Sequence, residues 1–281
     1  MSKKYFYIFT LILFPLFFLT SCLTTTTAAG NVGADRKQVM LISEEEMNQS
    51  AVEAYAEVLA EAKKAGTLNK DPATLQRVQK IAKKLIAQTT AFRSDAVNWD
   101  WQVNVITEDT INAWCMPGGK IVVYTGIIDS LKLTDGELAA VMGHEISHAL
   151  KEHSRERASQ EALQSLGVSA AAAILGVKET GTQLLGLAAQ FTLGLPFSRK
   201  HETEADHIGT ELMARAGYDP HEAVTIWQKM EEVSGTSVPE IMSTHPSHAT
   251  RIKDLQVIAE TVYPLYLEAT KQAKEPRKIS G

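Results

Sequence analysis

The sequence predicts an α+β fold that is predominantly helical, with a small β-sheet and one helix that carries a pair of histidines. Helix start signals, followed by apolar residues at helical spacing, recur along the chain, whereas a short central stretch alternates between apolar and polar residues as a strand does. The stretch VMGHEISHAL at 141–150 contains two histidines four residues apart. An apolar content of 44% and a charged content of 22% indicate a globular protein. A net charge of −5 without a cluster of Lys and Arg predicts no binding to nucleic acid.

The N-terminal stretch has the pattern of a targeting segment. Two lysines precede a long apolar run that ends in LTSC, whose last residue is Cys22. LTSC resembles a bacterial lipobox, which implies a lipoprotein signal peptide at 1–21 and a membrane anchor through lipid on Cys22. Because Leu23 follows the cysteine, the resemblance also implies the periplasmic face of the outer membrane in a bacterial cell envelope. The alternative is an uncleaved membrane helix, for which residues 5–21 are barely long enough and are interrupted by Pro15.

The remaining chain is divided by composition. Residues 22–42 begin with small polar side chains, which is typical of a tether, and residues 266–281 are expected to form a polar tail. Between them, residues 43–265 are expected to form one domain. The stretch 161–197 is rich in Ala, Gly and Leu but is broken by charged residues, so neither half can span a bilayer. It predicts either buried helices packed through small side chains or a surface that contacts a membrane or a partner.

The elements before the histidine pair follow from local signals. Ser43 followed by three glutamates predicts a helix that runs to about Ala65, and Asp71-Pro72 predicts the start of a second helix. A half-buried strand is predicted from the alternation of Trp99, Trp101, Val103 and Val105. The stretch INAWCMPGGKIVVYTG then predicts two extended segments joined by a turn at Pro117-Gly118-Gly119.

The histidine pair lies on a helix with its own start signal. Thr134-Asp135-Gly136-Glu137 fits a capping box just before the apolar pattern. Four residues of helix rotate by about 400°, so His144 and His148 project about 40° apart and can bind one ion. Glu145 lies beside His144 and can act on a water at that ion. This geometry is the physical content of the HExxH pattern of zinc peptidases, although the pattern alone also arises by chance.

A third ligand is expected from the stretch SRKHETEADHIG at 198–209. A catalytic zinc needs three protein ligands and an open position. Glu202 and Asp206 are four residues apart, so Glu202 could bind the ion while Asp206 accepts a hydrogen bond from the far nitrogen of a liganding histidine. Two imidazoles and one carboxylate suit Zn2+ best, and we expect one ion per chain. Four other histidines have no predicted role and are expected on the surface: His153, His201, His207 and His221. Of these, His201 could lie near the site.

Four motifs together resemble metallopeptidase family 48. They occur in the order NAWCMPGGKIVVYTG, HEISHAL, HETEADHIG and STHPSHATRI, within roughly residues 70–260. The resemblance implies a zincin-like metallopeptidase domain, with His144, His148 and Glu202 as zinc ligands, Glu145 as the general base and Asp206 behind the ligands. The CAAX prenyl protease and HtpX-type branches of this family carry arrays of membrane helices that are not obvious here. The resemblance therefore favours the periplasmic BepA-like branch and argues against prenylated substrates.

If a zinc site is present, three further parts of the sequence could contribute to it. Asn112-Ala113-Trp114 could be an edge strand that pairs with an extended substrate, as the family pattern favours, or an ordinary hairpin strand. His245 could stabilise the oxyanion, could block the open metal position, or could be a loop histidine without a role. Arg251 could pair with an acid of the site.

The sequence thus predicts a membrane-anchored, zinc-dependent endopeptidase that hydrolyses peptide bonds of misfolded or misassembled envelope proteins. A metal-activated water would attack the peptide carbonyl with Glu145 as the base. One alternative is an exopeptidase, for which no group that binds a free chain terminus is evident. Another is a chaperone or scaffold with latent protease activity, with the outer-membrane assembly machinery as partner.

Overall fold

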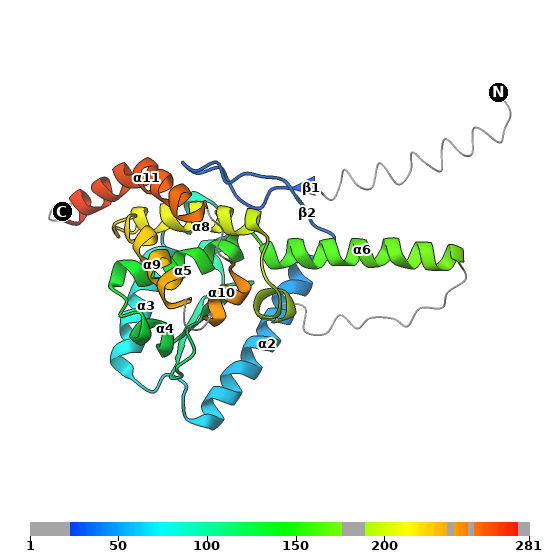
Figure 1. Cartoon of the computed structure of the whole chain (residues 1–281), viewed down its shortest axis with the longest axis horizontal. Helices are drawn as coiled ribbons and strands as arrows, with labels where there is room; N and C mark the ends of the chain where they lie inside the picture. The colour runs from blue at the N-terminus through cyan, green and yellow to red at the C-terminus, as the bar shows by residue number, and fades with distance from the viewer. Residues whose placement is uncertain (1–22, 176–188, 235–238, 247–249, 275–281) are drawn as a thin grey trace, which may run out of the picture.

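A computed structural model describes residues 23–175, 189–234, 239–246 and 250–274. Figure 1 shows helices packed around a small sheet, with one helix, α6, extending away from this body. The prediction of a predominantly helical α+β fold is confirmed. In chain order the elements are β1 (Leu23–Thr24), β2 (Gln38–Val39), α2 (Glu44–Ala65), α3 (Pro72–Ile86), the 3-10 turns η1 (Thr89–Ala91) and η2 (Ala96–Asn98), β3 (Gln102–Ile106), β4 (Ala113–Met116), β5 (Lys120–Tyr124), α4 (Thr125–Ser130), α5 (Asp135–Leu150), α6 (His153–Leu175), the π-helical turn η3 (Gln190–Gly194), α8 (Arg199–Arg215), α9 (Glu222–Ser234), α10 (Glu240–Thr244) and α11 (Arg251–Lys274).

The predicted helix start signals are confirmed. The Ser43 side chain accepts a hydrogen bond from the Glu46 backbone, and the Glu46 carboxylate accepts one from the Ser43 backbone. Thr134 and Glu137 form the same reciprocal pair at the start of α5. The Asp71 carboxylate accepts two backbone N–H groups at the start of α3. Each cap satisfies donors that the first helical turn leaves unpaired.

The sheet has the order β3-β5-β4, with β3 and β5 parallel and β5 and β4 antiparallel. Gly118 and Gly119 have φ values of 73° and 83° and form the predicted turn between β4 and β5. The strand predicted to begin at Trp99 begins instead at Gln102. Trp99 closes the 3-10 turn η2, and Trp101 packs over Gly119, where a β-carbon would lie 2.6 Å from its ring. The alternation of these aromatic residues therefore reflects packing at a turn.

Helices α5 and α8 cross at a pair of glycines. A β-carbon on Gly209 would lie 2.7 Å from the backbone nitrogen of His144, and one on Gly143 would lie 2.9 Å from the Gly209 carbonyl oxygen. Only glycines allow so close an approach of two helix backbones. The crossing brings the side chains of α8 directly against α5, in which every residue from Gly136 to Leu150 is buried.

The N-terminal segment corrects the prediction of a tether at 22–42. Residues 23–42 lie along the helical body and include the two-stranded sheet of β1 and β2 (Figure 1). Lys151, which is fully buried, donates hydrogen bonds to Thr27 Oγ1 at 3.1 Å and to the carbonyl oxygens of Ala34 and Arg36 at 2.9 and 3.0 Å. Small polar residues are common in tethers, but here they bind a lysine far along the chain.

The C-terminal boundary and the apolar stretch also differ from prediction. The tail predicted at 266–281 is helical as far as Lys274, because α11 continues past residue 265. In the stretch 161–197, residues 161–165 are exposed or half-buried on α6, so they are not the buried helix that one interpretation predicts. Residues 176–188 of that stretch, and the predicted signal peptide with Cys22, lie outside the described residues. Within the described ranges, no helix has both the length and the apolar character needed to cross a bilayer.

Candidate metal centre

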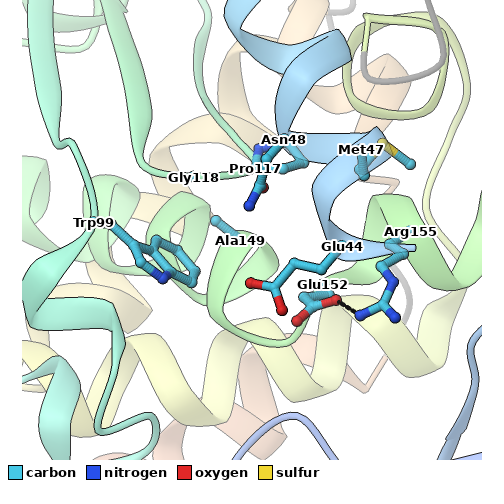
Figure 2. A pocket seen from close by; sticks show the side chains of 9 residues that line it. All are labelled: Glu44, Met47, Asn48, Trp99, Pro117, Gly118, Ala149, Glu152 and Arg155. Atoms are coloured by element: carbon cyan, nitrogen blue, oxygen red, sulfur yellow. Dashed lines mark hydrogen bonds and ion pairs between the residues drawn. The ribbon is translucent and has the colours of Figure 1, made fainter. Parts of the chain in front are cut away.

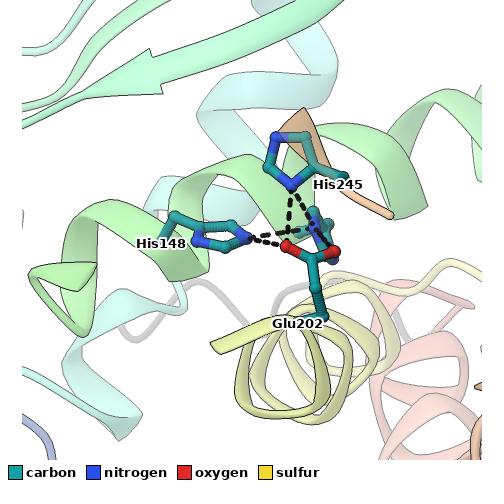
Figure 3. A group of neighbouring side chains, drawn as sticks. His148, Glu202 and His245 are labelled. Carbon is teal, nitrogen blue, oxygen red and sulfur yellow. Dashed lines mark hydrogen bonds and ion pairs between the residues drawn. The ribbon is translucent and has the colours of Figure 1, made fainter. Parts of the chain in front are cut away.

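Four side chains from three elements converge on one point. His144 and His148 project from α5, Glu202 from α8, and His245 follows α10; Figure 3 shows His148, Glu202 and His245 pointing toward one another. His144 Nε2 lies 3.1 Å from His148 Nε2 and 3.2 Å from His245 Nδ1. Glu202 Oε1 lies 3.1 Å from His245 Nδ1 and 3.6 Å from His148 Nε2. All four side chains are buried.

These donors fit a tetrahedral metal ion. Donor atoms placed about 2.0–2.1 Å from a central ion at the corners of a tetrahedron lie roughly 3.3 Å from one another. Five separations among these groups run from 3.1 to 3.6 Å, with Glu202 Oε2 nearest His144 and Oε1 nearest the other two rings, and all four donors lie within 4.8 Å of one another. Three imidazole nitrogens and one carboxylate oxygen are a donor set that zinc accepts. A metal-binding site is therefore supported by the geometry, while the choice of zinc rests on the donor chemistry.

His144 is held from behind by a carboxylate. Its Nδ1 lies 2.9 Å from Asp206 Oδ1, which leaves Nε2 free to face the ion. Asp206 in turn accepts hydrogen bonds from Nε and Nη2 of the fully buried Arg251, both at 2.8 Å. Arg251 Nη1 lies 3.0 Å from Glu202 Oε2, and its guanidinium lies over the Trp227 ring, 3.3 Å from the centroid. The structure thus brings together Asp206 and Arg251 where the sequence placed them, and adds Trp227.

The charges of the site affect metal ligation in two ways: they keep Glu202 anionic, and they favour a proton on His144 that a metal ion must displace. Burial alone would raise the pKa of Glu202, but His245, His144 and Arg251 hold that pKa well below its ordinary value, so Glu202 is an anion. Burial alone would lower the pKa of His144, but Asp206 and Glu202 raise it to about 9. A metal ion therefore competes with a proton for the His144 ring.

Glu145 has the surroundings of a general base. Its Oε1 is buried and makes no hydrogen bond within the described part of the chain, and it lies 3.6 Å from His245 Nε2. Burial raises the pKa of Glu145, an effect that His245 and His144 partly oppose. A carboxylate with raised proton affinity accepts a proton from water more readily at neutral pH.

The structure corrects the expectation that His153 and His201 lie on the surface, since both are buried. His153 Nδ1 lies 3.0 Å from His148 Nδ1, and the rings of His153 and His201 stack with centroids 4.5 Å apart. Burial and the neighbouring His201 lower the pKa of His153 to about 3, so its ring is neutral. The cause of the error is Glu152, whose φ of 53° redirects the chain between α5 and α6 and turns His153 back toward His148. Helical spacing cannot reveal such a contact.

The predicted substrate strand lies at the edge of the sheet, but the site is covered. Ala113 and Trp114 belong to the edge strand β4, and Asn112 precedes it. Phe191 of η3 packs in one apolar cluster with Trp114. The Phe197 backbone donates to the Thr244 carbonyl at 2.8 Å, and the Phe197 ring stacks on His245 with centroids 5.2 Å apart. Phe197 stands out by no motif or spacing in the sequence, so its role could not be predicted.

A separate small pocket lies where α2, the turn between β4 and β5 and the end of α5 meet (Figure 2). Glu44, Glu152 and Arg155 line it, and Glu152 is paired with Arg155 and with Arg93. None of the four converging donors lines this pocket. Each of its charged groups is in an ion pair, Glu152 with Arg155 and Glu44 with the neighbouring Arg93, so these groups have a structural role.

The family model for peptidase family M48 matches residues 72–259, which is more than half of the chain. The chain belongs to this family. The sequence-based assignment to a metallopeptidase of family 48 is therefore confirmed. The match includes the four converging donors, Glu145 and the crossing of α5 with α8.

Several curated proteins are similar to the chain. The mitochondrial metalloendopeptidase OMA1 of Schizosaccharomyces pombe is 36% identical over 79% of this chain and 64% of its own length. That of Arabidopsis thaliana is 38% identical over 63% of this chain and 35% of its own. The β-barrel assembly-enhancing protease of Escherichia coli is 27% identical over 71% of this chain and 42% of its own. The chain thus spans less than two thirds of the length of these relatives.

These relatives correct the predicted location. The periplasmic face of a bacterial outer membrane was expected, but the relatives from fission yeast, Arabidopsis thaliana, cattle, budding yeast, zebrafish and human are mitochondrial by name. The prediction of a bacterial outer-membrane location is therefore wrong. It rested on LTSC and the residue after it, a short pattern that precedes the family match and whose four residues LTSC lie outside the described part of the chain.

Proposed function

We propose that this protein is a zinc-dependent endopeptidase that hydrolyses internal bonds of extended or misfolded polypeptides. The observation that carries the proposal is the convergence of His144, His148, Glu202 and His245 beside the buried base Glu145, in a chain of peptidase family M48. When bound, zinc would lower the pKa of a water and polarise the peptide carbonyl. Glu145 accepts the proton of that water and delivers it to the leaving amine.

The resting site is closed in this proposal. A catalytic zinc keeps one position open for water or substrate, whereas His245 supplies a fourth donor here. Phe197 stacks on His245 and is hydrogen-bonded to Thr244, so the segments that carry them cover the site together. Of the predicted alternatives for His245, these contacts support blockage of the fourth position. Substrate binding then requires His245 to leave.

Substrate is proposed to bind along β4 as an added strand. Backbone pairing with Asn112, Ala113 and Trp114 would give affinity without demanding a particular sequence, which suits unfolded chains. Because Phe191 packs against Trp114, η3 must move as well. The substrate strand and the metal site would therefore open in one event.

The proposal is tested with two variants of the purified protein. Glu145→Gln is expected to bind zinc as the wild type does and to lose about 100-fold or more of its turnover, because only the base is removed. Glu202→Ala is expected to lose zinc, as measured by elemental analysis. Mass spectrometry of a digested unfolded protein should show internal fragments; release of single residues would support an exopeptidase. Unchanged proteolysis by Glu145→Gln would refute the role of the base.

A chaperone or assembly role is the second candidate, and the closed site favours it. A protein that binds polypeptides without cutting them would retain its biological effect when the base is absent. Rescue of a deletion phenotype by Glu145→Gln would support that role, and failure to rescue would support proteolysis. Membrane attachment through lipid on Cys22 stays a separate prediction, which mass spectrometry of the mature N-terminus tests.

A further inference from the structure

A chain of hydrogen bonds leads from His148 to the N-terminal segment. His148 Nδ1 lies 3.0 Å from His153 Nδ1, and His153 Nε2 lies 3.1 Å from Glu204 Oε2. Glu204 accepts hydrogen bonds from Nε and Nη2 of Arg36 at 2.5 and 2.8 Å. The family match begins at residue 72, so it assigns nothing to Arg36.

The donors and acceptors along this chain are consistent with only one arrangement. When His148 presents the lone pair of Nε2 to an ion, its Nδ1 carries a hydrogen and must donate. His153 Nδ1 must then accept, so its hydrogen is on Nε2. A carboxylate is an acceptor only, and Glu204 is the partner of that Nε2. Each link thus selects the tautomer of His148 that binds metal.

Arg36 is itself held in place from several sides. Its Nη1 and Nη2 donate to both oxygens of Glu156, at 2.6 and 2.7 Å. Gln38 Nε2 donates to Glu156 Oε2 at 2.7 Å. The buried Lys151, one residue beyond α5, donates to the Arg36 carbonyl oxygen. The guanidinium therefore has a fixed position between Glu156 of α6 and Glu204 of α8.

We propose that residues 34–38 are part of the metal centre, and that Arg36 and His153 are positioning residues which fix the ring of His148 through Glu204. The inference rests on the proposed metal site. It explains why the N-terminal segment, which lies outside the matched family domain, packs where it does. Groups behind a metal-binding histidine are known in general to set its tautomer and orientation.

The test uses the full-length protein and three substitutions. His153→Phe keeps a ring to stack on His201 but loses both hydrogen bonds. His153→Gln is the conservative variant, because its amide offers one acceptor and one donor. Arg36→Gln removes the charge behind Glu204. Arg215→Gln is the matched control: Arg215 pairs with Glu211 on the same helix α8, and Glu211 also accepts from the Asn31 backbone of the same N-terminal segment.

Zinc affinity is measured by competition with a chelator, and the ligand geometry is measured from the visible absorption of the cobalt-substituted protein. His153→Phe is expected to bind zinc about 10- to 100-fold more weakly and to show an altered cobalt spectrum. Arg36→Gln should weaken zinc binding and change the cobalt spectrum in the same direction but by less. His153→Gln should bind zinc nearly as tightly as the wild type. Arg215→Gln should match the wild type.

The zinc affinities and cobalt spectra of these variants show whether Arg36 and His153 position the ring of His148. Wild-type affinity and spectrum in both Arg36→Gln and His153→Phe would overturn it, and so would an equal loss in Arg215→Gln. If His153→Phe does not fold, the comparison of Arg36→Gln with Arg215→Gln decides: weaker zinc binding in Arg36→Gln alone supports the inference, and equal binding in the two overturns it. A wild type that binds no metal would refute the proposed function itself, whereas tight binding that no substitution changes would refute only this inference.

Discussion

His144 and His148 of α5 face the same proposed metal position, but the Nδ1 atoms of their rings have different hydrogen-bond partners. His144 donates to the carboxylate of Asp206, which is paired with an arginine that has no exposure to solvent. His148 is bonded to the neutral ring of His153, and the pair behind it, Arg36 and Glu204, has side chains 18% and 14% exposed. A carboxylate gives a charge-assisted hydrogen bond that a neutral ring cannot give. The His144 side is therefore the rigid one, and the His148 side is the one that can be adjusted.

The two sides also come from different parts of the chain. Asp206 and Arg251 both lie within the residues matched by the family model, whereas Arg36 lies before them. The rigid side is thus a property of the M48 domain, and the adjustable side is completed by a segment outside the matched residues. The matched domain therefore supplies the whole of the His144 side, whereas on the His148 side it supplies His153 and Glu204 and depends on the N-terminal segment for Arg36.

The largest expected effect is on the rigid side. Arg251→Met should lower the free energy of unfolding by about 3–5 kcal/mol, because it leaves Asp206 and Glu202 buried without their cation. Arg36→Gln should lower the free energy of unfolding by less, because Arg36 and Glu204 keep some contact with water. Urea unfolding of the metal-free proteins at neutral pH measures both. Equal losses would remove the distinction between the two sides.

Both sides depend on the glycine crossing, which gives the next effect. Gly209→Ala should destabilise the fold by about 1–3 kcal/mol, because the new methyl group would meet the backbone of Gly143 and His144. Helix propensity alone predicts the opposite sign, a gain of about 1 kcal/mol. Gly194→Ala is the control, since a β-carbon there meets nothing within 4 Å. Thermal unfolding of the two variants decides; stabilisation by Gly209→Ala would show that the helices are not in close contact.

Acid should weaken the adjustable side by a smaller amount. Burial alone would raise the pKa of Glu204, but His153 and Arg36 lower it from 4.5 to about 2. A carboxyl whose pKa is lower in the folded chain stabilises the fold above the unfolded pKa, and this contribution is lost as the pH falls from about 4.5 to about 2. The excess stability of the wild type over Glu204→Gln should therefore shrink in that window. Unfolding of both at about pH 7, 4 and 3 measures it, and a difference that stays constant over these values would contradict the assignment.

Much of the site could be predicted from sequence because its spacing is local. The capping box at Thr134 fixes the start of α5, and helical geometry then puts His144 and His148 on one face. The same geometry relates Glu202 and Asp206 on α8. In each case the regular geometry of a helix places two side chains four residues apart on the same face, so their proximity follows from the sequence.

The remainder could not be predicted because it depends on contacts between distant residues. Arg36 binds the carboxylates of Glu156 and Glu204, which lie 120 and 168 positions further along the chain. The composition of the N-terminal segment gives no sign of these partners. The contact between His153 and His148 could not be predicted from helical spacing, because Glu152 adopts a left-handed conformation between the two helices. Gly143 and Gly209 are the exception, since an unexplained glycine in each helix could have signalled the close crossing.

X-ray absorption at the zinc edge of the purified protein, with the zinc content per chain, tests the central claim most directly. We expect one zinc per chain with four nitrogen or oxygen donors at about 2.0–2.1 Å and no sulfur. We also expect that Glu202→Ala loses most of this zinc. Protein that binds no divalent metal, or a spectrum with sulfur at about 2.3 Å, would show that His144, His148, Glu202 and His245 do not form the metal site.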